Sequence, residues 1–502
     1  MVKMESASYH DRNVGNERVW LLTALGIVFI LGICVRLINL QNVTVRSPDE
    51  RNYVRQAQAV QQNGIQGVRN LVEQFRQDSS NFLSASPTRA GYLWLLAGTM
   101  TATGIEDERA GADLSCLASV LSLLLLGWIG WRFFNPTIGL IAALFYAVSP
   151  IELAIARRCW QDAPTELLVL ILVWIACEIT RGSRHTILFF LFGLLGATAV
   201  TIKESPVVMF VLVLAWILWE LSIRREWKGI ILVTGLSAAG LSVGVLWLSY
   251  NLGDFQTLLD FSRTASRFYE TNSYSIIYEG GPSYLLLEAL WILSPVVVLG
   301  SVAGFAMSFA GSRQWPLAKW AWRPAFCMTV IVLLFLSLAM FLHHKLNPRY
   351  IALTLGIWYL IAATGLWRAL EWIRKQFPEI GKHVFATGAA CLLLLAALSD
   401  YSTFQTRIVA TGIQDLTARM IISPTGRISP AEEKEMAISY RETLANAHPT
   451  PERYLTLSLA FYQTNRFQDC IDASKEAIAL RPDYAPAYTN ICAANNMLGR
   501  FA

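Results

Sequence analysis

Long uncharged apolar runs constrain the fold of this sequence more than any other feature. Each approaches the roughly 20 residues that a helix needs to cross a bilayer, and only 15% of the 502 residues are charged, against about a quarter in a soluble domain. We therefore expect an all-α, polytopic membrane protein of about eleven transmembrane helices. The expected spans are residues 19–40, 113–131, 136–155, 164–180, 186–202, 205–223, 229–250, 283–309, 325–342, 350–366 and 384–399.

The first run and the charge balance fit this class. Residues 20–40 exceed a signal-peptide core and lack a small-residue cleavage site after them, which favours a retained span. The net charge of +5 comes from basic residues in short loops, so it gives no reason to expect a nucleic-acid partner. Six of the 8 cysteines are scattered in or beside apolar runs without metal-ligand spacing, which favours small core residues.

Residues 90–104 decide the sidedness, because they are apolar but short for a span. If they do not cross and residues 1–18 are cytoplasmic, the short cytoplasmic loops carry about twice as many Lys and Arg residues as the outer ones, as the positive-inside rule requires. A crossing would largely invert this bias. We therefore predict a helix on the outer membrane surface here. This helix belongs to a long first outer loop, residues 41–112. We expect the loop to be part of a catalytic transmembrane domain over residues 19–399. The tail, residues 400–502, is then also on the outer side.

The sequence Ser47-Pro48-Asp49-Glu50 has two interpretations. As a helix start, Ser47 caps, Pro48 takes the first helical position and Glu50 reaches back to the cap amide. The position within about ten residues of the first span suggests chemistry instead, because a carboxylate kept ionised by a helix N-terminus can accept a proton from an acceptor hydroxyl. We expect both to hold, with Asp49 and Glu50 as catalytic candidates mounted on a rigid helix start.

Other charges gather on the same predicted outer edge. The arginine pair in "ARRCWQDA" suits a phosphate, or consists of interfacial snorkelling side chains. The aspartate of that loop, Asp162, either caps a helix or belongs to the site. In "KES", Lys203 either pairs with Glu204 or belongs to the site. In "HHKLNPRY" the adjacent histidines cannot both face one ligand in a helix, so we expect no metal site; the alternative for its cations is interfacial anchoring. The phosphate-binding candidates are Arg157, Arg158, Lys203, Lys345 and Arg349, and the further candidates are Asp162, His343, His344 and Tyr350.

The tail shows a repeat pattern. Residues 451–484 fill one 34-residue period with aromatic, leucine, alanine and proline positions typical of a tetratricopeptide repeat, and a second period begins at Ala485. Such arrays usually need about three units, so we expect the segment to pack on the membrane domain or the array to continue. Cys470 and Cys492 occupy small-residue positions of consecutive periods, as either buried thiols or a disulfide.

Taken in order, these motifs resemble the GT-C glycosyltransferases, in particular the protein O-mannosyltransferase and lipid A aminoarabinose transferase group. The matching features over about residues 19–370 are the Asp-Glu pair, "YLWLLAG", "WRFFNPTIGLIAALFYAVSP", the Arg and Asp loop, "TIKESPVV" and "HHKLNPRY". The resemblance implies a sugar donor on a polyprenyl phosphate and inverting transfer by direct displacement, with Asp49 as the base and no catalytic metal. Glu204 departs from the pattern, since the family tends to have glycine there.

The resemblance also implies partners and a location. We expect a polyprenyl-phosphate donor, a protein, lipid or glycan acceptor, surrounding membrane lipids and a protein partner on the tail, in a bacterial inner membrane with the site on the periplasmic side. One alternative is an O-antigen ligase or polymerase, but the large outer loop of those enzymes comes late in the chain. The other is a lipid-linked glycan transporter, which would have paired polar residues near mid-membrane and related halves.

Overall fold

The computed structural model is all-helical in the residues that it describes. These are residues 2–38, 40, 48–77, 86–258, 284–310, 322–342, 348–409, 435, 438–439, 441–442, 445–446 and 449–500. The chain divides into two compact units. The first comprises Met1–Leu258, Leu290–Ser337 and Ile351–Gln414, and the second comprises Leu259–Ala289, Leu338–Tyr350 and Asp415–Ala502.

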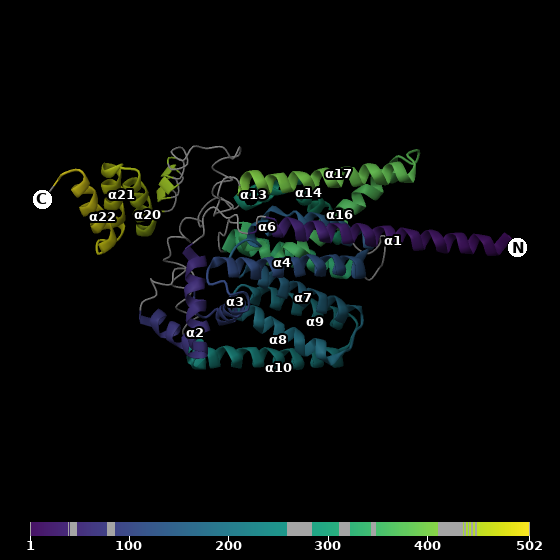
Figure 1. Cartoon of the computed structure of the whole chain (residues 1–502), viewed down its shortest axis with the longest axis horizontal. Helices are drawn as coiled ribbons and strands as arrows, with labels where there is room; N and C mark the ends of the chain where they lie inside the picture. Colours follow the sequence, from purple (N-terminus) through teal and green to yellow (C-terminus); the bar gives the residue numbers. More distant parts are fainter. Residues whose placement is uncertain are drawn as a thin grey trace. The chain divides into compact units, whose positions relative to one another are not determined.

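The first unit is a helix bundle (Figure 1). α2 lies across one end of the bundled helices and packs on α3 (Figure 1). The helices are α1 (Val2–Leu37), α2 (Pro48–Gln77), α3 (Ala90–Thr103), α4 (Glu108–Ile129), α5 (Pro136–Ala147), α6 (Pro150–Ile155), α7 (Asp162–Arg181), α8 (Thr186–Ile202), α9 (Pro206–Ile223), α10 (Trp227–Leu252), α14 (Pro295–Phe309), α15 (Trp322–Ser337), α16 (Leu355–Gln376) and α17 (Lys382–Thr403). α13 (Tyr284–Leu293) precedes α14.

The spans confirm an integral membrane protein. Within the described residues, 8 helices are long and apolar enough to cross a membrane, or 9 if the bent pair Leu286–Leu293 and Pro295–Phe309 is one span. Two shorter apolar helices, Pro136–Ala147 and Thr186–Ile202, occupy two further predicted segments. The count of eleven therefore stays a prediction. The helix expected over 90–104 is present as α3, with 14 residues, and its place on the membrane surface stays a prediction.

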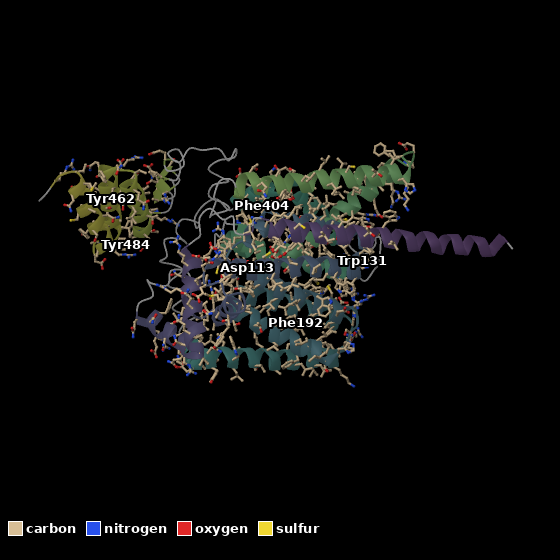
Figure 2. The ribbon with its side chains drawn as sticks, in the orientation of Figure 1. Asp113, Trp131, Phe192, Phe404, Tyr462 and Tyr484 are labelled. Carbon is tan, nitrogen blue, oxygen red and sulfur yellow. The ribbon has the colours of Figure 1, made fainter. Side chains whose placement is uncertain are left out.

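Glycines set the closest helix contacts. A Cβ atom on Gly193 of α8 would lie 1.8 Å from the Ser237 carbonyl oxygen of α10, and one on Gly365 of α16 would lie 2.0 Å from the Gly300 oxygen of α14. Small residues of this kind let membrane helices approach backbone to backbone. Aromatic packing fills the interior beside them, where the ring of the fully buried Phe192 (labelled in Figure 2) stacks on Phe210, with 5.0 Å between the two ring centroids.

α17 is the least covered helix of the first unit. Only Ala397 and Asp400 are buried along it. A polar contact fixes it, since the Ser294 hydroxyl donates to the Asp400 carboxylate. The expected boundary at residue 400 falls inside this helix, which runs on to Thr403 and continues as a π-helix, Phe404–Val409.

The second unit contains the helices α20 (Pro451–Gln463), α21 (Phe467–Leu480) and α22 (Ala485–Met497). The helix expected at Ala485 begins there. Their shared core includes Leu457, Phe461 and Cys470, whereas Cys492 is exposed, and both cysteines are free thiols. The helical hairpin fits the period predicted over 451–484, and its assignment as a tetratricopeptide repeat stays a prediction.

Candidate active site

The acidic pair lies in the first turn of α2, which begins at Pro48 as predicted. Asp49 is half-buried, whereas Glu50 is fully buried. The Glu50 carboxylate accepts a hydrogen bond from Nη1 of Arg158 at 2.8 Å and another from the Cys159 backbone N–H at 2.9 Å. Ser47 and its cap amide lie outside the described residues. Glu50 therefore ties the start of α2 to the loop over residues 156–161.

That loop follows α6, which has Pro150 in its first turn and the Ser149 hydroxyl as its N-cap. Arg157 donates to the carbonyl oxygens of Val35 at 3.2 Å and Ile38 at 2.9 Å, near the C-terminal end of α1. A cation is favourable at such an end. Its guanidinium also lies 5.0 Å from the ring centroid of Phe404.

The arginine pair therefore has a different setting from the one predicted. Arg157 and Arg158 are 3% and 6% exposed, so the interpretation as snorkelling side chains is wrong. Both instead hold parts of the chain together: Arg157 contacts α1, and Arg158 contacts α2 while lying 5.2 Å from the Trp160 ring centroid. Phosphate binding by this pair stays a prediction.

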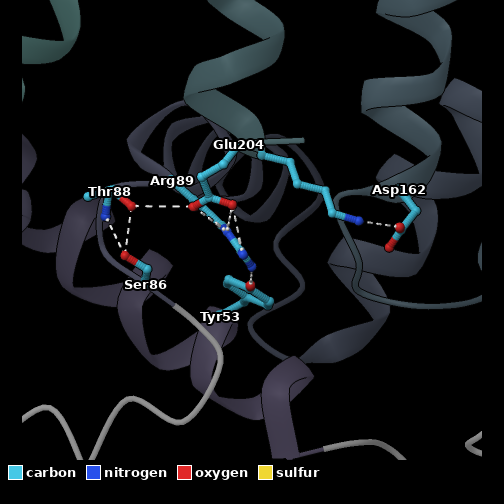
Figure 3. A network of polar contacts seen from close by, with 7 residues as sticks. Tyr53, Ser86, Thr88, Arg89, Asp162 and Glu204 are labelled. Carbon is cyan, nitrogen blue, oxygen red and sulfur yellow. Dashed lines mark hydrogen bonds and ion pairs between the residues drawn. The ribbon is translucent and has the colours of Figure 1, made fainter. Parts of the chain in front are cut away.

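A second ion pair joins Lys203 and Asp162, with Nζ and Oδ1 2.7 Å apart (Figure 3). The Asp162 side chain is 1% exposed and that of Lys203 is 11% exposed. Asp162 is the first residue of α7 and its neighbour Gln161 is the N-cap residue, without a side-chain cap bond, so the interpretation of Asp162 as an N-cap is wrong. The pairing of Lys203 with Glu204 is wrong as well.

Glu204 instead binds Arg89, a residue that the sequence analysis did not single out. Nε of Arg89 lies 3.0 Å and 3.1 Å from the two carboxylate oxygens, and Nη2 lies 2.9 Å from Oε2 (Figure 3). Arg89 also donates to the Tyr53 hydroxyl of α2. Although burial would raise the pKa of Glu204, the facing guanidinium lowers that pKa below its usual range. The one feature of the sequence that could have indicated Arg89 is its place as a lone cation directly before an apolar helix, α3.

Only part of the motif "HHKLNPRY", residues 343–350, lies within the residues that the structure describes. Arg349 and Tyr350 belong to a 3₁₀ helix, Pro348–Thr354, in which Arg349 is buried and Tyr350 half-buried. His343, His344 and Lys345 lie outside the described residues. Arg349 and Tyr350 fall in the second unit, whereas the other described candidates fall in the first.

The described candidates of the first unit form two fixed acid-base pairs, Glu50 with Arg158 and Asp162 with Lys203. Asp49 is held beside the first pair by its place on α2. In the described part of the chain, no group of three or more His, Cys, Asp or Glu side chains could hold a metal ion. The arrangement places the half-buried Asp49 carboxylate at a helix start, next to a loop that carries two buried arginines.

One part of the chain matches the model of a known protein family. Residues 90–250 match the family described as dolichyl-phosphate-mannose-protein mannosyltransferase. This stretch carries a glycosyltransferase pattern. No curated protein matches the chain significantly.

The fold is similar to solved glycosyltransferases. The archaeal oligosaccharyltransferase AglB from Archaeoglobus fulgidus, in complex with an inhibitory peptide and a dolichol-phosphate, aligns with TM-score 0.54 and 13% identity over 79% of this chain and 56% of that one. Its apo form aligns with TM-score 0.54 and 13% identity over 86% and 60%. Apo ArnT from Cupriavidus metallidurans gives TM-score 0.49 and 13% identity over 97% and 78%. The chain thus spans little more than half the archaeal enzyme's length, and it shares a GT-C-like helical fold.

Proposed function

We propose that this protein is an inverting membrane glycosyltransferase. It moves a sugar from a polyprenyl-phosphate donor to a protein, lipid or glycan acceptor on the outer side of the membrane. The family match over residues 90–250 supports the reaction class and the donor class. The AglB structure that shares the fold was solved with a dolichol-phosphate and an inhibitory peptide, which supports a lipid phosphate as the carrier.

The observation that carries the proposal is the mounting of Asp49. This half-buried carboxylate stands in the first turn of α2, close to the predicted end of the first span. Its neighbour Glu50 is fixed to Arg158 and to the Cys159 N–H. Glu50 is thus a positioning residue, and Asp49 is the group that faces the reaction.

The reaction follows from these roles. Asp49 accepts the proton of the acceptor hydroxyl, and the acceptor oxygen forms a bond to the anomeric carbon of the sugar. The bond between that carbon and the phosphate oxygen breaks, and its electron pair leaves with the lipid phosphate. One displacement inverts the anomeric configuration. Positive side chains stabilise the departing phosphate, and we assign this role to Lys203, Lys345 and Arg349, without a catalytic metal.

Lys203 suits this role because its position is fixed. Its ammonium group donates to Asp162 at 2.7 Å, which holds it beside the first turn of α7. Arg157 and Arg158, the other two phosphate-binding candidates, also have a structural role, since their described partners are backbone carbonyls and Glu50. They hold in place the loop over residues 156–161, which Asp162 directly follows.

The test is the replacement Asp49→Asn, which keeps the size and the helix-start compatibility of the side chain but cannot accept the proton. We expect product formation to fall by at least about 100-fold, with unchanged affinity for a polyprenyl phosphate. Because the sugar is unidentified, mass spectrometry of surface glycans and glycoproteins from cells with and without the protein would first define the product.

A matched control is Asp107→Asn, since the Asp107 side chain accepts from the Arg109 N–H as the N-cap of α4 and asparagine caps equally well. This variant should form product at the level of the unaltered protein. Wild-type product levels from Asp49→Asn, at equal protein amounts, would remove Asp49 from the role of base.

We also propose that the tail is a tetratricopeptide-like module that serves the acceptor. Its three helices enclose a small shared core, and short arrays of this kind usually need further burial.

A further inference from the structure

Two glutamates are buried in the first unit away from the residues assigned above. Glu152 lies on α6 and Glu166 on α7, and both side chains are 0% exposed. The two carboxyl groups are neighbours. None of their four oxygen atoms makes a hydrogen bond of ordinary geometry within the described residues, and the possible donors nearest to Glu166 are the Tyr146 hydroxyl and the Gly356 backbone N–H. Such a pair needs a ligand, because an unpaired buried carboxylate is costly.

A third group points at the pair independently. The hydroxyl of Tyr146, at the end of α5, is fully buried and lies next to the Glu166 carboxyl group, just outside ordinary hydrogen-bond geometry. The Tyr146 ring packs edge-on against Tyr359 of α16, with 5.8 Å between centroids. A buried phenol therefore closes the same small space that the two carboxyl groups share.

One buried cation lies on the other side of Tyr146. The Arg36 guanidinium is 5.6 Å from the Tyr146 ring centroid and is 0% exposed. It donates to the carbonyl oxygens of Gly32, Tyr146 and Ala147 and to the Ser119 hydroxyl. All of these acceptors are neutral, and no carboxylate of the described residues lies within ion-pair distance of Arg36. Its charge is hydrogen-bonded but not neutralised by contact.

The charge of Arg36 favours one proton on the pair of glutamates. Two adjacent ionised carboxylates in a buried site repel each other strongly, so such pairs keep a proton. With both groups neutral, the buried Arg36 would have no anion nearby, whereas with one proton the pair carries one negative charge and balances Arg36. The other titratable groups that neighbour the pair are Cys116 and Tyr359, and neither is cationic.

We propose that Glu152 and Glu166 form a proton-binding site, in which the two carboxyl groups share one proton beneath the Tyr146 hydroxyl. The proton links α6 to α7, and these helices bound the loop over residues 156–161. Glu166 is also one helical turn after Asp162. The shared proton therefore holds in place the loop that carries Arg158 and the helix start that carries Asp162.

Infrared spectroscopy of the purified protein tests this directly, since protonated and ionised carboxyl groups absorb separately. At neutral pH, the spectrum of the wild-type protein minus that of Glu152→Gln/Glu166→Gln should contain one protonated carboxyl group and one carboxylate. The matched control Glu106→Gln/Glu379→Gln removes two exposed side chains and should remove two carboxylates and no acid. Two acids, or two carboxylates, in the first difference would overturn the proposal.

A second measurement needs no variant. With ¹³C-labelled glutamate in the wild-type protein, the band of a protonated glutamate should correspond to one group per chain at neutral pH, separate from any aspartic acid. The band should be the same in sodium-free and sodium-rich buffer. Its absence, or its loss when sodium is added, would show that the pair is ionised or holds a metal cation instead of a proton.

Discussion

Replacing Arg158 with methionine should destabilise the protein strongly and specifically. The change keeps an apolar stem of similar length but removes the guanidinium that lies 2.8 Å from Glu50. Glu50 is 0% exposed, so water cannot take over the lost contact. The Cys159 N–H, 2.9 Å from the other oxygen, remains as the second described donor to that carboxylate.

The magnitude follows from this geometry. Removing one partner of a buried ion pair costs about 3–5 kcal/mol, and the surviving N–H bond places Arg158→Met near the lower end of that range. Glu50→Gln should cost about 2–3 kcal/mol, because it leaves a guanidinium that is only slightly exposed without its anion. The double variant should cost little more than either single one, which gives a coupling energy of about 2–3 kcal/mol.

The assay is equilibrium unfolding of the four proteins in detergent micelles. A control cycle uses Arg132→Met and Glu178→Gln, whose pair has the same chemistry at 2.7 Å but with side chains 37% and 15% exposed; it should show a coupling of at most about 1 kcal/mol. Additivity of the Glu50 and Arg158 changes within about 0.5 kcal/mol would refute the reasoning that this pair fixes α2 to the loop.

Three further predictions concern other parts of the chain. Gly365→Ala should lower the free energy of unfolding by about 1–3 kcal/mol because its Cβ would overlap a backbone oxygen of α14, whereas Gly98→Ala, with open space around it, should be neutral or stabilising; equal effects in unfolding assays would contradict the packing. The ion pair with Arg89 lowers the pKa of Glu204, so the stability that this pair contributes should be complete above the ordinary glutamate pKa of about 4.3. It should be lost as the pH falls through the lower pKa that Glu204 has in the folded protein. Thermal unfolding as a function of pH checks this, because the Glu204→Gln variant should lack that acid-dependent loss. Deleting residues 427–502 should impair acceptor use more than polyprenyl-phosphate binding, and normal transfer by the truncated protein would leave the tail as a docking module for another partner.

The sequence carries the information that is local. The apolar runs predict most of the helices, Pro48 marks the start of α2 and Ala485 that of α22. Those signals arise from neighbouring residues, and so they can be recognised without the fold. The acidic pair after the first span was found in this way as well.

Which charges meet could not be predicted from the sequence. Lys203 and Glu204 are adjacent, yet the backbone at Lys203 is extended, with φ −153° and ψ 149°, and successive side chains of an extended chain point in opposite directions. Lys203 therefore reaches Asp162 of α7, and Glu204 reaches Arg89 before α3. Together the two pairs join three segments that only the folded bundle brings close to one another.

Arg36 illustrates a second limit. It lies near the end of the first apolar run, where a cation usually indicates the membrane interface. The structure instead buries it completely among carbonyl oxygens and beside Tyr146. A single sequence position cannot distinguish these two environments, because the difference lies in how α5 and α1 pack.

Because few of its residues are buried, α17 is the helix of the first unit that a surrounding bilayer would affect most. Only 11% of its apolar window is buried, so most of its surface contacts lipid, and the tilt of such a helix adjusts to bilayer thickness. The π-helix that continues it places Phe404 5.0 Å from the Arg157 guanidinium, next to the loop that holds Glu50. We therefore expect the activity of the protein to depend on the acyl-chain length of the bilayer around it.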